Sequence, residues 1–149
     1  MHARRRAMGR SVWACVGVMA ILLAGCASMR EGGSGNAVDV TLSGSQESPP
    51  VNAPGSGKGT ITVGGDRSVS GSVTTTGVAG TMAHIHQAAA GQYGPVIIPL
   101  TRTGEGIWSV PAGAKLTEAQ YEAFKAGNLY VNVHTDANKG GEVRGQLKP

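Results

Sequence analysis

The 149-residue sequence is poor in cysteine, and this excludes a fold held together by disulfide bonds. Its two cysteines, Cys15 and Cys26, both lie near the N-terminus. The rest of the chain must therefore be stabilised by burial of apolar side chains and by backbone hydrogen bonds. It offers no thiol as a nucleophile, and the Gly-x-Ser-x-Gly elbow, the phosphate-binding loop and the dinucleotide fingerprint are also absent. These absences argue against an ordinary hydrolase.

An excess of positive charge is also missing once the N-terminus is set aside. The chain has 13 Lys and Arg residues against nine Asp and Glu residues. Four of the arginines and none of the acidic residues lie in residues 1–25, so the remainder carries nine of each sign. The basic net charge therefore belongs to the N-terminal segment, and binding to nucleic acid is not indicated.

Residues 1–25 have the parts of a secretory signal peptide. The four arginines form a basic start, a short apolar run covers residues 12–23, and small residues precede Cys26. The run is too short for a helix that spans a membrane. Leu23-Ala24-Gly25-Cys26 resembles the bacterial lipobox, which implies cleavage before Cys26 and lipidation of its thiol. The alternative is an ordinary signal peptide with an incidental cysteine.

The residues after Cys26 favour a flexible, lipid-anchored arrangement in the cell envelope. Residues 26–36 are rich in glycine and serine, as in a tether. Cys26 is followed by Ala27 and Ser28. In bacterial lipoproteins, which this segment resembles, an aspartate after the cysteine would retain the protein at the inner membrane. We therefore expect a signal peptide (1–25), a tether (26–36) and one domain (37–149), anchored in the outer membrane and facing the periplasm or the cell surface.

Residues 37–149 are predicted to form an all-β domain. Apolar and polar residues alternate in short segments separated by Gly-, Pro- and Asn-rich turns, which is typical of strands. We expect a Greek-key-like antiparallel β-sandwich. The two prolines of residues 95–100 favour a place at the edge of a sheet. The expected strands cover residues 38–43, 60–63, 68–74, 82–87, 95–100, 107–110, 129–135 and 142–147.

One short helix is predicted before the penultimate strand. Thr117 and Gln120 have the spacing of a capping box, in which each side chain pairs with the other residue's backbone N–H. Leu116 and Tyr121 are placed for a hydrophobic staple, and Gly127 suits the end of the helix.

Histidine is scarce, and three of the four histidines fall on two of the predicted strands. His84 and His86 alternate with the apolar Ala83 and Ile85, and His134 follows Val133. If the apolar side chains face the core, the three imidazoles stand on the outer face. Alternate residues on a strand lie about 6.5–7 Å apart, and neighbouring strands about 4.8 Å, so three imidazoles can converge on one ion if the two strands are neighbours. The sequence therefore predicts a transition-metal site, with exposed polar histidines as the alternative.

Four motifs in order resemble the CHRD (chordin) domain family. They are Ala-His-Ile-His at 83–86, Gly-Pro-Val-Ile-Ile-Pro-Leu at 94–100, Gly-Asn-Leu-Tyr-Val-Asn-Val-His-Thr at 127–135 and Gly-Gly-Glu-Val-Arg-Gly-Gln-Leu at 140–147. The resemblance spans residues 38–147. It implies an extracytoplasmic domain of the kind found in chordin-like and bacterial envelope proteins. A non-catalytic interaction module with structural histidines is therefore the alternative function.

A second resemblance, to copper–zinc superoxide dismutases, adds chemistry. His-Ile-His on a strand is similar to that family's copper-binding pair, and Val133-His134 followed by Arg144 is similar to its later copper ligand and its substrate-guiding arginine. Carried over, His84, His86 and His134 would bind copper and Arg144 would attract superoxide. The chain has no bridging histidine, no zinc-ligand cluster and no disulfide. The resemblance thus implies a copper-only site with an open position, and a superoxide dismutase-like activity if the protein is an enzyme.

Several roles remain open at this point. Neutral imidazoles are good ligands for both zinc and copper, although copper generally binds them more tightly. Arg144 lies on one strand face with Glu142 and Gln146, so a cross-strand salt bridge is its alternative role. Tyr130 and Asn132 share the face of His134 and either orient the metal ligands or are plain surface residues.

Overall fold

The structure is a computed structural model that describes residues 35–149. The predicted signal peptide, the predicted lipidation site Cys26 and nearly all of the predicted tether lie outside the described residues. Among the described residues, no helix has the length and apolar character needed to cross a membrane.

The described chain is all-β with one α-helix, as predicted. Its helical elements are the 3-10 turn η1 (Gly44–Gln46) and the helix α1 (Glu118–Lys125), which precedes the penultimate strand. Its strands are β1 (Asn36–Ser43), β2 (Ser56–Val63), β3 (Val69–Thr76), β4 (Gly80–Gln87), β5 (Val96–Pro99), β6 (Thr101–Gly104), β7 (Ile107–Ser109), β8 (Leu129–Thr135) and β9 (Val143–Leu147).

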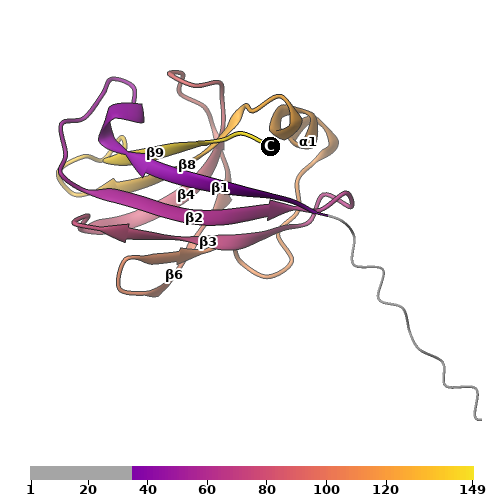
Figure 1. The fold of residues 1–149 in the computed structure, drawn as a ribbon, viewed down its shortest axis with the longest axis horizontal. Helices are drawn as coiled ribbons and strands as arrows, with labels where there is room; N and C mark the ends of the chain where they lie inside the picture. The colour runs from indigo at the N-terminus through magenta and orange to yellow at the C-terminus, as the bar shows by residue number, and fades with distance from the viewer. Residues whose placement is uncertain (1–34) are drawn as a thin grey trace, which may run out of the picture. The chain divides into compact units, whose positions relative to one another are not determined.

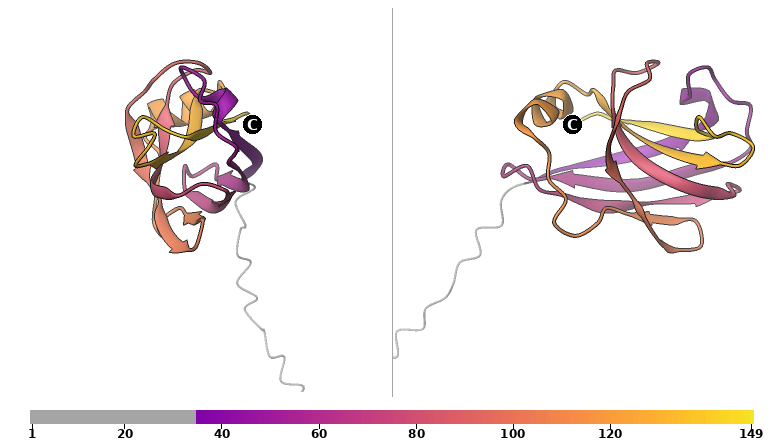
Figure 2. Two further views of the ribbon diagram at one scale, coloured as in Figure 1. Left: turned by 90° about the vertical axis from the view of Figure 1, so that its left-hand side faces the viewer. Right: turned by 180° about the vertical axis from the view of Figure 1, so that it is seen from behind.

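The nine strands form one antiparallel sheet in the order β5-β4-β8-β9-β1-β2-β3-β7-β6. The sheet curls until it is nearly closed around the core (Figures 1 and 2). The last strand, β9, lies between β8 and β1, which gives the Greek-key-like return predicted from the sequence. β5 forms one end of the sheet, so the prolines do mark an edge strand.

The core follows the predicted alternation. In β1, Val38, Val40 and Leu42 are buried, whereas the intervening Asp39 and Thr41 are exposed. Strand β8 differs, because all seven of its residues are buried. One face of β8 packs against the core, and its other face is covered by loops.

Helix α1 has the predicted ends. Thr117 Oγ1 accepts the backbone N–H of Gln120, and the Gln120 side chain accepts the N–H of Thr117. Gly127 follows the helix with a φ of 71°, a left-handed conformation that favours glycine. The helix buries Phe124 against the core of the sheet.

Several strand ends differ from the prediction by a few residues, and two differences have a clear physical reason. Residues 56–59 were expected to be loop because they are rich in glycine, yet they begin β2. A Cβ on Gly59 would lie 2.1 Å from the carbonyl oxygen of Ser72 on β3. The glycine here permits a close approach of two backbones within the sheet, not a turn. Strand β6 was not predicted, because its sequence Thr-Arg-Thr-Gly has no apolar alternation.

Candidate metal centre

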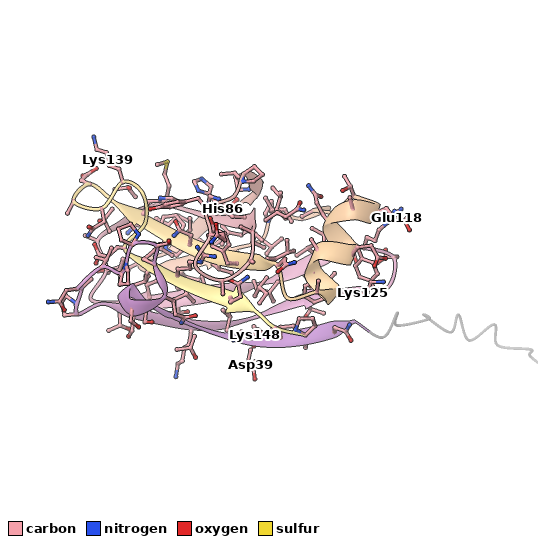
Figure 3. The ribbon with its side chains drawn as sticks, turned by 90° about the horizontal axis from the view of Figure 1, so that it is seen from above. Asp39, His86, Glu118, Lys125, Lys139 and Lys148 are labelled. Atoms are coloured by element: carbon pink, nitrogen blue, oxygen red, sulfur yellow. The ribbon has the colours of Figure 1, made fainter. Side chains whose placement is uncertain are left out.

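Strands β4 and β8 are neighbours and bring the three histidines to one place. In their antiparallel register, Met82 lies opposite His134, His84 opposite Asn132, and His86 opposite Tyr130. Ala83, Ile85 and Val133 point into the core, so the histidines all point outward. Figure 3 shows His86 on one side of the molecule and Asp39 of β1 on the other.

The imidazoles converge closely. His84 Nδ1 lies 3.0 Å from His134 Nε2. One nitrogen from each of the three rings can be chosen so that all lie within 4.8 Å of one another. The arrangement offers three nitrogen ligands to one metal ion, as the sequence predicted.

Backbone carbonyls fix which nitrogen each of two rings offers. His86 Nδ1 donates to the Gly94 carbonyl (3.0 Å), and His134 Nδ1 donates to the Lys139 carbonyl (2.9 Å). In the neutral rings the lone pair is therefore on Nε2. His84 Nδ1 then donates to the lone pair of His134 Nε2. In most metal sites a histidine ligand likewise donates the N–H of one ring nitrogen to a carbonyl or carboxylate and binds the metal with the other nitrogen, as His86 and His134 could do here.

One of these lone pairs has no partner. His86 Nε2 is buried and forms no hydrogen bond in the structure. A buried polar atom without a partner costs free energy, and such atoms are rare in folded proteins. A metal ion bound among the three rings would satisfy it, so the site fits a cation.

Burial favours the neutral, metal-binding form of the His84 and His86 imidazoles. Burial, followed by the neighbouring charges of His134 and His86, lowers the pKa of His84 to about 4. Burial also lowers the pKa of His86, despite the opposing hydrogen bond to Gly94. In both residues burial disfavours the charged imidazolium and favours the neutral ring, whose lone pair can bind a metal ion.

The site is less exposed than its outward position suggests. His86 is 8 % exposed, and residues 88–94 lie against it through Gly94, whose carbonyl accepts its Nδ1–H. His134 is 7 % exposed, and it contacts Lys139 in the connection between β8 and β9. The Tyr130 ring stacks on His86 with centroids 4.8 Å apart, and its hydroxyl accepts the N–H of Gly94. Tyr130 therefore contacts His86 directly, and its role in orienting a metal ligand stays a prediction.

Arg144 holds the loop of residues 88–94 in place. Its guanidinium lies 3.4 Å above the Tyr130 ring, and it donates to the carbonyls of Gln92 (2.8 Å) and Ala89 (3.0 Å). The side chain is 1 % exposed. None of the three ion pairs within residues 35–149 includes Arg144, so it does not form the alternative salt bridge. Its proposed attraction of superoxide stays a prediction.

Asn132 lies opposite His84 in the register, but its side-chain amide donates to a different buried group. Its Nδ2 donates to Glu47 Oε1 at 2.6 Å. Burial raises the pKa of Glu47 to about 7, although the charge of Arg144 and the hydrogen bonds from Ser48 and Asn132 oppose the rise. No sequence signal marked Glu47, which lies in a Pro-rich connection 85 residues before Asn132. The carbonyls of Gly94 and Lys139 were also unpredictable, because any residue supplies a carbonyl.

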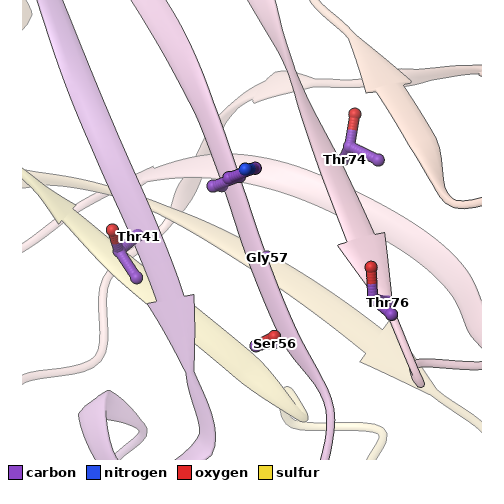
Figure 4. Close-up of a pocket in the computed structure, with 6 residues that line it drawn as sticks. Thr41, Ser56, Gly57, Thr74 and Thr76 are labelled. Carbon is purple, nitrogen blue, oxygen red and sulfur yellow. The ribbon is translucent and has the colours of Figure 1, made fainter.

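A hollow lies on the outer surface of β1, β2 and β3, apart from the histidines. It encloses about 330 Å³ and is lined mainly by hydroxyl side chains, as Figure 4 shows, from Thr41, Ser56, Gly57, Lys58, Thr74 and Thr76. Its only ionisable residue is a lysine, so it offers nothing to a metal ion. Among the described residues, the group whose ligand atoms converge as a metal ion requires is the histidine cluster, which is therefore the candidate site.

The comparisons with known proteins give one match. Neither the curated proteins nor the solved structures yielded a match to the chain. The family model described as the CHRD domain matches residues 38–147, which include β4, β8 and the three histidines. This match covers most of the chain, which belongs to the CHRD domain family.

Proposed function

We propose that the protein binds one copper ion through His84, His86 and His134 at the bacterial cell envelope. The observation that carries the proposal is the convergence of three imidazoles, two of them held by backbone carbonyls so that their Nε2 lone pairs face the cluster. His84 completes the set through Nδ1, after its proton moves to Nε2. No thiol is left in the described residues to compete for the ion.

The ligand set favours copper over other common metals. Magnesium and calcium prefer oxygen ligands, and none of the clustered ligand atoms is an oxygen. Imidazoles suit copper and zinc, and copper(II) binds nitrogen sites more tightly than zinc. Zinc is therefore the competing metal.

Superoxide dismutation is the reaction we propose for the copper-loaded site. Three protein ligands leave a position for a small ligand, as catalytic metal sites do. Bound copper would alternate between Cu(II) and Cu(I), so that one superoxide is oxidised to dioxygen and another, with two protons, is reduced to hydrogen peroxide. Arg144 would add positive charge beneath the surface near His86 and so attract the anion.

Copper titration and a rate measurement test this function together. The full-length protein in detergent, with His2→Ala, Cys15→Ser and Cys26→Ser so that no other histidine or thiol binds copper, should bind one equivalent of copper. The loaded protein should dismute superoxide faster than the same copper held by a chelator. A protein that binds one equivalent without this activity would be a copper-binding protein and not a dismutase. Failure to bind stoichiometric copper would instead favour the non-catalytic interaction module.

We further propose that Cys26 carries a lipid that anchors the domain in the outer membrane. The support is the lipobox-like Leu-Ala-Gly-Cys at the end of a signal-peptide pattern. A lipid anchor would keep the copper site in an extracytoplasmic compartment, where superoxide and copper both reach it without crossing a membrane.

Cys26→Ser should abolish lipidation, because serine has no thiol to receive the lipid. We expect the variant to stay unprocessed or to lose its stable membrane attachment, as measured by membrane fractionation and by mass spectrometry of the N-terminal peptide. Cys15→Ser is the matched control and should be processed like the wild type. Wild-type cleavage and membrane attachment of the Cys26→Ser protein would contradict the anchor.

A further inference from the structure

Met82 is an exposed methionine beside the histidine cluster, and packing does not explain it. It is the only methionine in residues 35–149, and its side chain is 51 % exposed. It is absent from the core cluster, although β4 contributes Ala83 and Ile85 to that core. An unbranched apolar side chain at an exposed strand position gains little from burial.

The register of the sheet places Met82 next to two of the ligands. Met82 lies directly opposite His134 across β4 and β8, and it precedes His84 by two positions on the same face. Directly opposite residues have Cβ atoms about 4.5–5.5 Å apart. The long, flexible methionine side chain can cover that separation.

We infer that the Met82 thioether is a fourth ligand, which gives the site a preference for copper(I). The inference rests on the proposed copper site and adds the residue that distinguishes its two oxidation states. Three imidazoles leave a fourth position, and Met82 is the soft donor nearest to it in the register. Thioether sulfur selects copper(I) over zinc and other harder cations.

Met82 also accounts for an open fourth coordination position on copper(II). A thioether is a weak ligand for the harder copper(II), so Met82 would leave the fourth position when the ion is oxidised. The side chain is half exposed, and it can therefore swing into solvent without disturbing the core. Met82 is thus a specificity-determining ligand, whereas the three histidines hold the ion in both states.

Met82→Leu tests the inference, because leucine keeps the apolar volume and removes the sulfur. The experiment uses the full-length chain in detergent, in a background with His2→Ala, Cys15→Ser and Cys26→Ser, so that no other histidine or thiol binds copper. We expect Met82→Leu to weaken copper(I) binding roughly tenfold or more and to change zinc(II) affinity less than about twofold. Competition with a coloured copper(I) chelator measures the first value, and X-ray absorption should show a copper–sulfur distance that the variant lacks.

Thr41→Met, made together with Met82→Leu, is the matched control. Thr41 is exposed on β1 on the face of Asp39, away from the histidines, so a methionine there should not restore copper(I) affinity. If wild type and Met82→Leu bind copper(I) equally and neither shows a copper–sulfur distance, Met82 is not a ligand, and the three-histidine site still stands. If the wild type binds no copper in either oxidation state, the proposed function fails and the role of Met82 fails with it.

Discussion

His134→Ala should weaken copper binding by at least about 100-fold. His134 supplies one of three nitrogens, and even changes to groups that only orient a ligand cost about 10- to 100-fold in metal affinity. The loss should be visible in two ways, as a lower binding constant and as the disappearance of copper-induced stabilisation. Wild type should gain about 4 kcal/mol of stability at a free copper concentration 1,000 times its dissociation constant, and the variant far less.

His2→Ala is the control for this experiment, since His2 is the only histidine outside the cluster. It should bind copper like the wild type. Circular dichroism of metal-free His134→Ala should show a folded β protein, because only the hydrogen bonds to the Lys139 carbonyl and to His84 are lost. Unchanged copper affinity in a folded His134→Ala protein would contradict the site.

The strands, the helix and the histidine cluster were predictable because each depends on local pattern. Alternation of apolar and polar residues fixes which side chains face the core, and the Thr117–Gln120 capping box fixes where α1 begins. The convergence of His84 and His134 needed one further assumption, that β4 and β8 are neighbours. The family resemblance did not supply that pairing, and the structure does.

The position of residues 88–94 beside the histidine cluster was not predictable, because it depends on contacts between residues that are distant in sequence. Arg144 reaches carbonyls 52 and 55 residues earlier in the chain, and its partners are backbone atoms that carry no sequence signal. The expectation of solvent-facing histidines therefore missed the burial of His86 and His134. The continuity of the sheet was hidden for a similar reason, since the glycines at the start of β2 are typical of a loop when considered without their partner strand.

Arg144→Ala should destabilise the domain by about 1.5–3 kcal/mol or more, because hydrogen bonds from a charged donor each contribute roughly that much. Three hydrogen bonds and the stacking on Tyr130 would be lost, and the carbonyls of Gln92 and Ala89 would be left without their donor. Urea denaturation of the metal-free protein measures the loss. The loop that Arg144 holds should also open, so we expect protease cleavage within residues 88–94 well before global unfolding.

Arg144→Lys separates the structural role of Arg144 from its proposed electrostatic role. Lysine keeps the positive charge but cannot bind two carbonyls with a planar fork or stack in the same way. If Arg144 acts on superoxide through its charge, copper-loaded Arg144→Lys should retain most of the dismutation rate while losing stability. The uncharged Arg144→Gln should lose rate as well, and its deficit should shrink as salt screens the field. Equal rates in the lysine and glutamine variants at low salt would mean that the arginine only holds the loop against His86 and does not attract the anion.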